Sequence, residues 1–599
     1  MFLSKLTIKN FRRLDEITFN FVDGLNVIVG ENNIGKTALV DALRVILASH
    51  EDPYLRITED DIFQPKDGRE ASGDITFHFV FSDLNESDEA DFLHALVPID
   101  KEKFEAHIHA RFSLIDASGR MRLKRWCGEH EEVGMTSDML ENLRGVYLQP
   151  LRDASKGLKP GRNSQLARLM RLIGEEDTLG KQSVDGLVRA FEKLLKRKPP
   201  LVSTGNSIVE KHKDMLGEQL SQELSLGLSG ADFKELSSKL SITTNGMEID
   251  TNGLGYNNLI FMAVVLSEMI KDPSAAYRGL IIEEPEAHLH PQLQVVLLDY
   301  FQTIAASKVE KSIQLFVTTH SSNFASLANL ENLTCMVDRN RSVKVFNPRE
   351  ATFDTSKAKA EKKRKKLERY LDVTKAELFF ARKLILVEGT AELMLIGVLA
   401  KQLGYDLQKY AVSIISVDGL IFDCFLPLMG QEKLAIPVAV ITDADPTKEE
   451  NSSGTKKTVP LYPSASDNVI ASDNTKSLKE QECDLVKVFF GVKTLEYDLA
   501  LHEDNRSIML DALSEIHPQI AQSIKDDIKD KATDQEKAKA LFCGMFERGD
   551  GLKNVQKGRF AQELAYQVSI TSANFVVPDY IRDAIKHVIE GGDILDEAF

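Results

Sequence analysis

Residues 30–37 read GENNIGKT, and this stretch constrains the fold more strongly than any other part of the sequence. It matches the pattern G-x-x-x-x-G-K-[ST], in which a glycine-rich backbone wraps around phosphate oxygens. The apolar run LNVIVG ends at the first glycine, and a helical pattern with Leu39, Leu43 and Leu47 follows the threonine. A buried strand, a glycine turn and a helix in this order predict a P-loop within an α/β domain.

Each residue type in this motif suits the binding of ATP with Mg²⁺. Gly30 and Gly35 allow the tight turn that directs backbone N–H groups at phosphate oxygens, and Asn33 lies within the wrapped segment. Lys36 would supply a cation to the β- and γ-phosphates, and Thr37 would supply a hydroxyl ligand to Mg²⁺. We therefore expect these five residues to bind the nucleotide.

Two later strand ends carry groups suited to phosphoryl transfer. The apolar run 279–282 is followed by Glu283, which can hold Mg²⁺ through water, and by Glu284, which can orient or deprotonate the attacking water. The apolar run 315–319 is followed by His320. A lone histidine is more often structural, but this one ends the strand after the acidic pair, which favours a role at the same site.

These pieces together resemble the ABC-type ATPases. The order acid–acid–proline resembles their Walker B motif and D-loop, with Glu283 where the family usually has aspartate, and His320 resembles the switch histidine that senses the γ-phosphate. The glycine-containing turn within 251–261 resembles a degenerate ABC signature, and Gln149 resembles the Q-loop glutamine. The resemblance implies that Gln149 also serves the nucleotide site.

The opening segment, IKNFRR at 8–13, is similar to the start of SMC-like and DNA-repair ABC ATPases. That resemblance implies that Arg12 contacts the nucleotide phosphates. ABC signatures act across a dimer, so a single ATPase head implies a homodimer, a higher homo-oligomer or a partner head.

A second set of carboxylates follows later strands. Glu388 ends the apolar run 384–387, and Glu392 falls on the first turn of a helix that we expect to begin near Thr390. The apolar run 437–441 leads to Asp443 and Asp445, which alternation places on one side. Four carboxylates at neighbouring strand ends repel one another unless a cation neutralises them, and oxygen ligands suit Mg²⁺, Mn²⁺ or Ca²⁺. The alternative is two solvated acidic loops.

This Glu…Asp-x-Asp arrangement resembles the Toprim domain, and an ABC-type ATPase followed by Toprim resembles the OLD (overcoming lysogenisation defect) family, which is related to the Gabija and retron-associated nucleases. The resemblance implies an ATPase–nuclease that cleaves DNA with two metal ions, in defence against phage. Carried over by motif, the metal ligands are Glu388, Glu392, Asp443 and Asp445, with an accessory ligand Asp418, a second-metal ligand Glu496 and an active-site lysine, Lys557. Glu388, Asp443, Lys557 and the ATPase Glu284 are then the catalytic residues.

The pattern of strands and helices predicts an α/β chain with five segments. We expect an ATPase domain in two parts, a helical insertion that serves dimerisation or forms a self-contained hairpin, a basic linker helix and a Toprim domain of Rossmann-like fold. Their predicted ranges are 1–155 and 236–355 for the ATPase, 156–235 for the insertion, 356–375 for the linker and 376–599 for Toprim. Within the last, the polar stretch 446–478 reads as a loop insertion.

The net charge of −17 excludes nucleic-acid binding through bulk charge, so DNA contact needs local basic patches or carboxylate-held metal ions. One such patch is the run 357–369, with eight basic and two acidic residues, although a solvated linker helix would look the same. Five scattered cysteines fit a reducing cytoplasm, and no stretch predicts a signal peptide or a membrane span. We therefore expect a cytoplasmic protein whose partners are DNA, a second copy and an operon-encoded helicase-like or other defence protein, with no membrane.

Two histidine pairs carry no metal prediction. His288 and His290 fall on the D-loop, and His107 and His109 share one strand face, but neither pair has an evident third ligand. Three other functions stay open: a non-cleaving ATP-driven DNA clamp, a Toprim primase and a topoisomerase. The primase would lack its zinc-binding cysteines, and no tyrosine lies in a recognisable topoisomerase motif.

Overall fold

A six-stranded sheet carries the nucleotide-binding motifs. Its order is β14-β13-β3-β12-β11-β8, and all neighbours are parallel except β13 and β14. Strands buried on both faces read as near-continuous apolar runs, and β3 and β12 are buried along their whole lengths, although each also contains polar residues. The strands are β3 (Leu25–Gly30), β8 (Leu143–Leu148), β11 (Tyr277–Glu283), β12 (Gln314–Thr319), β13 (Leu333–Arg339) and β14 (Ser342–Phe346).

Two layers cover this sheet. On one face, Ile28 packs with α1 (Lys36–Arg44) and with an antiparallel sheet, and on the other face Val27 and Val29 pack with α9 (Leu254–Lys271) and α10 (Pro291–Ala306). The antiparallel sheet runs β2-β1-β4-β6-β5, and β7 pairs with β6. Its strands are β1 (Phe2–Phe11), β2 (Leu14–Asn20), β4 (Ile75–Ser82), β5 (Leu96–Asp100), β6 (Lys103–Leu114) and β7 (Met121–Cys127), with the short helices α2 (Glu86–Asp91) and α3 (Ser137–Glu141) nearby in sequence.

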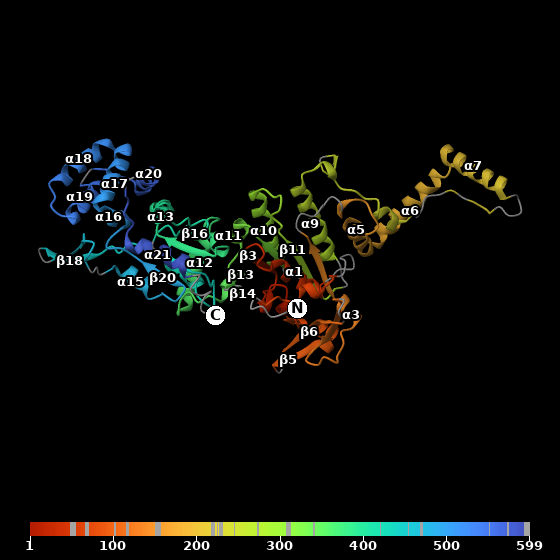
Figure 1. The fold of residues 1–599 in the computed structure, drawn as a ribbon. Coiled ribbons are helices and arrows are strands. Elements are labelled where there is room, and N and C mark those ends of the chain that lie inside the picture. The colour runs from red at the N-terminus through yellow and green to blue at the C-terminus, as the bar shows by residue number, and fades with distance from the viewer. Residues whose placement is uncertain are drawn as a thin grey trace.

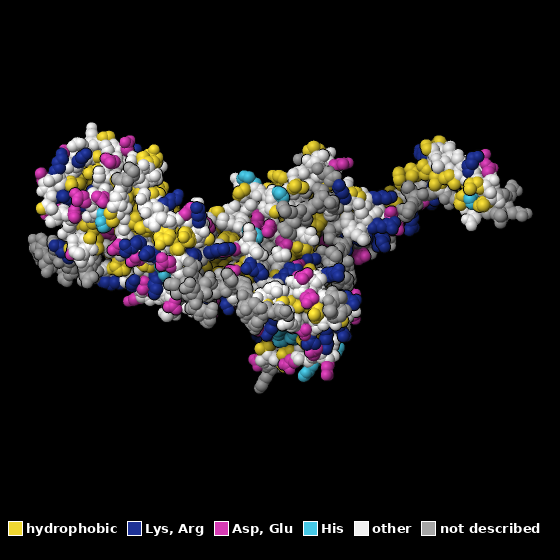
Figure 2. Space-filling view, viewed as in Figure 1, with side chains coloured by type: hydrophobic (Ala, Val, Ile, Leu, Met, Phe, Trp, Pro, Cys, Tyr) yellow, Lys and Arg dark blue, Asp and Glu magenta, His cyan; other side chains and the backbone are white. Residues whose placement is uncertain are grey.

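An arm of helices interrupts the ATPase domain, at the right of Figure 1. It contains α5 (Gln165–Glu176), α6 (Thr178–Leu195), α7 (Pro199–Leu216) and α8 (Phe233–Ser237), and a two-stranded pair, β9 (Thr243–Thr244) and β10 (Met247–Glu248), follows it. Figure 2 shows apolar side chains on the surface of this arm. On α6 they include Leu187, Phe191 and Leu194, with 69%, 57% and 59% of their surface exposed, which leaves an apolar helix face uncovered by the described residues.

A four-stranded parallel sheet forms the centre of the C-terminal half. Its order is β16-β15-β17-β20, with β15 (Lys383–Val387), β16 (Val412–Ser416), β17 (Val438–Ile441) and β20 (Val486–Phe489). The flanking helices are α13 (Thr390–Gln402), α14 (Phe422–Phe425), α15 (Asp473–Lys479) and α21 (Asp579–Glu590). A helical bundle packs against α13 and comprises α16 (Leu495–Ala500), α17 (Glu503–Ile516), α18 (Pro518–Lys529), α19 (Asp534–Phe546) and α20 (Lys557–Ile570). The predicted loop at 446–478 is wrong in part, because it contains the hairpin of β18 (Thr447–Ser452) and β19 (Thr455–Pro460) and the start of α15.

One apolar cluster joins the two halves. It runs from Val29 of the ATPase sheet through Leu367 of α12 (Lys357–Tyr370) and Phe379 to Leu384 and Leu386 of β15. The basic run therefore lies on a helix that is anchored by Leu367, and its Lys363 pairs with Asp354 at 3.3 Å. The two sheets share a core and are not joined by a loose tether.

The structure describes residues 1–47, 55–65, 71–100, 103–115, 119–149, 157–216, 222–224, 226, 232–244, 246–271, 275–306, 313–339, 342–419, 421–452, 455–467, 471–549, 552–571 and 574–591. Within these ranges, no helix combines the length and the apolar character that crossing a bilayer requires. All five cysteines are free thiols.

Candidate active sites at two sheet edges

The backbone of the P-loop has the shape that phosphate binding needs. Gly30 has a φ of 157°, and a Cβ there would lie 2.7 Å from the carbonyl oxygen of Met336. Asn33 and Gly35 also have positive φ, at 62° and 112°. The glycines of the motif are therefore required by the turn itself, as the sequence predicts.

Lys36 is held inside this loop. Its Nζ donates to the carbonyl oxygens of Gly30 at 2.6 Å and Glu31 at 2.7 Å, and it lies 3.1 Å from Nδ1 of His320. Burial lowers the pKa of Lys36 to about 8, although nearby carboxylates, Glu284 foremost, oppose the shift. The ammonium is thus directed at the space where the loop would receive phosphate.

The acidic pair after β11 faces the same space. Glu283 accepts a hydrogen bond from the Tyr147 hydroxyl at 2.9 Å, and burial raises its pKa. Glu284 has a φ of 45°, which turns its side chain toward His320, whose Nε2 lies 3.3 Å from Oε1 of Glu284. The predicted metal-holding acid, water-orienting acid and switch histidine therefore lie together beside Lys36.

Glu286 is a residue of this site that the sequence did not single out. Its Oε1 accepts hydrogen bonds from the Thr319 hydroxyl at 2.6 Å and the His320 backbone N–H at 3.0 Å, so it fixes the turn that carries the histidine. Burial raises its pKa, and its Oε2 is buried without a hydrogen-bond partner. In the sequence, the third acid of 283-EEPE-286 was the feature that could have pointed to Glu286.

The two arginines that follow β1 contact different parts of the ATPase domain. Arg12 is bound by Asp41 at 2.7 Å and Asp61 at 2.8 Å. Arg13, which was not singled out, donates to the P-loop carbonyl of Asn33 and pairs with Asp338 at 3.5 Å. Arg13 therefore contacts the loop directly, whereas Arg12 braces it through α1.

The remaining ATPase predictions concern Gln149 and the signature-like segment. Gln149 directly follows β8, whose Leu148 pairs with Ile282, so Gln149 lies at the same sheet edge as Glu283. The signature-like segment opens α9 at Leu254, and a Cβ on Gly255 would lie 2.5 Å from the His288 carbonyl oxygen. The start of α9 thus packs against the D-loop.

The second site lies at the carboxyl edge of the C-terminal parallel sheet. Glu388 follows β15 and accepts a hydrogen bond from the Thr442 hydroxyl at 3.3 Å. Glu392 lies in the first turn of α13, which begins at Thr390 as expected. Asp443 accepts a bond from the backbone N–H of Leu495 at 3.3 Å. Three predicted acids, from β15, α13 and the end of β17, therefore meet at one edge.

These carboxylates disfavour one another's charge. Burial is the largest cause that raises the pKa of Glu388, Glu392 and Asp443. Neighbouring carboxylates raise them further: Asp445 acts on Glu388, and Glu496 acts on both Glu392 and Asp443. A divalent cation would relieve this repulsion.

Glu496 and Lys557 complete the cluster. Oε2 of Glu496 lies 3.1 Å from Nζ of Lys557 and 3.1 Å from the Thr494 hydroxyl, whereas its Oε1 is buried without a hydrogen-bond partner. Burial lowers the pKa of Lys557, but Glu496 and Asp443 outweigh it and the net shift is upward. The lysine remains charged and supplies the positive charge at the centre of the acids.

The donor set fits hard divalent cations. It consists of carboxylate oxygens, and Oε1 of Glu496, which accepts no hydrogen bond from the described residues, offers a ligand atom. Glu388, Glu392, Asp443 and Glu496 would hold such ions. In the described part of the chain, no three of these acids bring oxygens within 4.8 Å of one another, so the edge is an open cluster around Lys557.

Two predicted ligands lie at the periphery. Asp418 pairs with the buried Lys375 at 2.8 Å, so that a metal ion would compete with a lysine for it. Asp445 is exposed with a φ of 39°. β17 ends at Ile441, two residues before Asp443, so a turn and not strand alternation orients the two aspartates.

An ion pair connects the P-loop with the amino end of β15. Nε of Arg382, the residue before β15, lies 2.6 Å from Oε2 of Glu31, the second residue of the P-loop. Arg382 thus stands at the start of the strand that ends at Glu388, and Glu31 follows the strand that ends at Gly30. Through this ion pair, a change in the conformation of the P-loop can act directly on β15, a strand of the sheet that carries the acids.

Comparison with known proteins agrees with this geometry. Residues 1–118 and 140–325 match the family described as AAA ATPase domain, which is about half of the chain. Residues 379–445 match the family described as "Overcoming lysogenization defect protein-like, TOPRIM domain". The two domains indicate that the chain uses a nucleotide and divalent metal ions.

Curated relatives cover both halves. An OLD nuclease of Thermus scotoductus is 28% identical over 457 residues, which cover 74% of this chain and 82% of the relative. An endonuclease GajA of Bacillus cereus is 25% identical over 470 residues, 70% of this chain and 64% of the relative. Among solved structures, the C-terminal region of the Burkholderia pseudomallei OLD protein aligns with 36% of this chain and 99% of its own, at 26% identity and a TM-score of 0.25. The N-terminal half of the chain therefore belongs to the AAA ATPase domain family, and an OLD-like Toprim domain follows it.

Proposed function

We propose that the chain is an ATP-binding and ATP-hydrolysing DNA endonuclease or nickase that depends on divalent metal ions and acts in defence against phage. The observation that carries this proposal is the convergence of Glu388, Glu392, Asp443 and Glu496 around Lys557 at one sheet edge. The names of the relatives, nuclease and endonuclease, support the same activity and suggest DNA as the substrate.

At the Toprim site, bound Mg²⁺, Mn²⁺ or Ca²⁺ would supply a Lewis acid, and in a pair such ions activate water and stabilise the leaving oxygen. Glu388 and Asp443 would hold the ions from the sheet, and Glu392 and Glu496 would hold them from α13 and α16. Lys557, anchored 3.1 Å from Glu496, offsets the charge that builds on the scissile phosphate.

At the P-loop, Lys36 exchanges its two carbonyl partners for the β- and γ-phosphates of ATP. Thr37 and Glu283 would provide ligands for Mg²⁺, and Glu284 would orient the attacking water. Because His320 lies between Lys36 and Glu284, it can report the γ-phosphate to both. We propose that ATP binding or turnover gates access to the nuclease site.

Supercoiled plasmid incubated with the protein and Mg²⁺ or Mn²⁺ tests the activity. We expect nicked and linear products. The double variant Asp443→Asn with Asp445→Asn should abolish cutting and leave ATP hydrolysis intact, because it removes charge at the sheet edge only. Lys36→Ala should abolish ATP hydrolysis and alter cutting only through its regulation.

Other products would point elsewhere. Relaxed topoisomers would indicate a topoisomerase, and unchanged DNA with retarded migration would indicate a non-cleaving clamp. Cutting that persists in the aspartate double variant would contradict the proposed site.

A further inference from the structure

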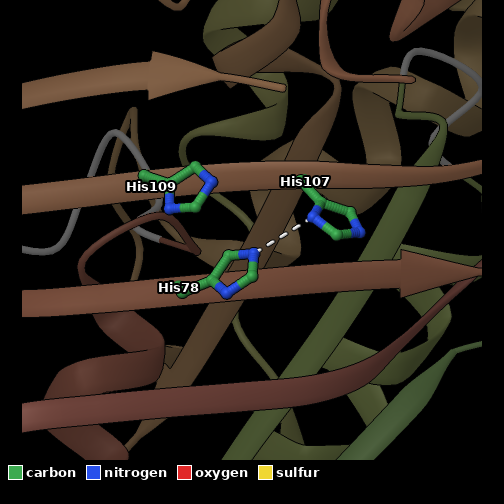
Figure 3. A group of neighbouring side chains, drawn as sticks. All are labelled: His78, His107 and His109. Atoms are coloured by element: carbon green, nitrogen blue, oxygen red, sulfur yellow. Dashed lines mark hydrogen bonds between the residues drawn. The ribbon is translucent and has the colours of Figure 1, made fainter. Parts of the chain in front are cut away.

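Three histidines gather on the outer face of the antiparallel sheet, far from both acidic sites in sequence. His78 lies on β4 directly opposite His109 of β6, and Val80 lies opposite His107. Alternate residues of a strand share a face, so His107 and His109 both project beside His78 (Figure 3). Pairing of the strands supplies the third histidine that the pair at 107–109 lacked.

The three imidazoles have the spacing of metal ligands. Nε2 of His78 lies 3.2 Å from Nδ1 of His107. The rings of His78 and His109 stack with centroids 4.1 Å apart at 7°, and because an imidazole binds a metal ion in its own ring plane, the His109 ring would turn out of this stack to share an ion with the other two. One ring nitrogen from each histidine lies within 4.8 Å of the other two. Two nitrogens bound to one tetrahedral ion at about 2.0–2.1 Å are about 3.3 Å apart, which matches the His78–His107 distance.

Neighbouring side chains contact two of the three rings. Trp126 of β7 stacks on His109 with centroids 4.8 Å apart at 4°. Oε2 of Glu105 lies 3.4 Å from Nε2 of His107, and Glu105 itself accepts a hydrogen bond from the Ser82 hydroxyl at 2.7 Å. A carboxylate on the far nitrogen is the usual support of a metal-bound histidine, because it leaves the other nitrogen free as a ligand.

The rings are also in the right protonation state. Burial is the largest cause that lowers the pKa of His78 to about 3 and of His109 to about 4; His109 and His107 lower the pKa of His78 further, and His107 lowers that of His109. Lys5 adds to the effect on His78, whereas a hydrogen bond with the backbone of Gly128 opposes it on His109. Both imidazoles are neutral at physiological pH, and a neutral imidazole is the form that binds metal.

We propose that His78, His107 and His109 form a binding site for a divalent transition-metal ion of the zinc, nickel or cobalt class, which cross-links β4 to β6. Imidazole nitrogens favour these ions over Mg²⁺ and Ca²⁺, whereas the carboxylates at the two sheet edges favour the reverse. The protein would then sort metal ions between chemically distinct sites.

Isothermal titration of full-length, tag-free protein with Ni²⁺ tests the site. The protein is first stripped with chelator, and excess Mg²⁺ is present to occupy the carboxylates. We expect one equivalent of Ni²⁺ to bind wild type and this equivalent to be lost in the double variant His78→Asn with His107→Asn. His130→Asn, an exposed histidine near the end of β7, is the matched control and should retain it.

A second measurement separates binding from folding. The thermal midpoint without Ni²⁺ should be similar in wild type and in the single variant His107→Gln, because this face of the sheet is only half-buried. Added Ni²⁺ should raise the midpoint of wild type and of His130→Asn, but not of His107→Gln. Equal stoichiometry, or an equal rise, in the histidine-site variants would overturn the proposal and leave the histidines as a packing stack.

Discussion

The ion pair of Lys557 with Glu496 also bears on stability, because Glu496 is fully buried. Replacing Lys557 by Met leaves a carboxylate without its cation, which should lower the free energy of unfolding by about 1–3 kcal/mol. Glu496→Gln in the same chain should recover part of this loss, since an amide tolerates burial better than an isolated charge. Urea unfolding of the two single variants and the double variant measures the coupling. Additive effects would show that the ion pair does not stabilise the fold.

The acids of the Toprim edge should make cutting depend on pH and metal together. The pKa values of Glu388, Glu392 and Asp443 are raised, so in the metal-free protein they keep protons at a higher pH than ordinary carboxyls. Cations bind the deprotonated form, so nuclease activity at low Mn²⁺ should rise with pH through this raised range, and higher Mn²⁺ should shift the midpoint to lower pH. Plasmid cutting at several Mn²⁺ concentrations measures this, and a midpoint independent of Mn²⁺ would contradict it.

Single residues also show what the sequence could and could not predict. Glu283, Glu388 and Asp443 were predictable because each follows an apolar strand, and parallel strands bring their carboxyl ends to one edge. The sequence did not predict that His78 lies beside His107 and His109, because neither strand's sequence predicts that β4 pairs with β6. The same holds for Lys375, whose capture of Asp418 depends on the packing of distant segments.

At the scale of elements, the strands that are buried on both faces were the easiest to predict. β3, β11, β12 and β15 are apolar runs that end in functional residues. The hairpin of β18 and β19 was missed because its sequence, from Thr447 to Pro460, is polar and has no apolar face to mark it as a strand. Such a hairpin depends on backbone pairing more than on burial.

The contact between the P-loop and β15 gives a prediction at this scale. Arg382→Ala removes the ion pair with Glu31, whose two side chains are 66% and 22% exposed, so the loss of stability should be below about 1 kcal/mol. We expect cutting without nucleotide and ATP hydrolysis to stay near wild type, whereas the effect of ATP on cutting should shrink. The ratio of cutting rates with and without ATP measures it. Lys383→Ala, the adjacent residue, is the control.

At the scale of the whole molecule, we expect the helical arm to hold two copies together. Leu187, Phe191 and Leu194 recur along one face of α6. The resemblance to ABC-type heads implies a second copy as the partner that would cover this face. Leu187→Asp with Phe191→Asp should convert a dimer or higher oligomer to monomer, as measured by light scattering after size exclusion. The exposed Lys193→Asp on the same helix is the control. A variant that keeps the wild-type mass would place the interface elsewhere.

The shared core and the Arg382–Glu31 contact couple the nucleotide-binding domain to the sheet that carries the acids. Linkage between two such sites is reciprocal. If a bound nucleotide tightens the hold on DNA by some factor, then bound DNA tightens the hold on that nucleotide by the same factor. Bound DNA would thus raise the affinity of the protein for ATP, and the protein would respond to its target through a change in nucleotide occupancy.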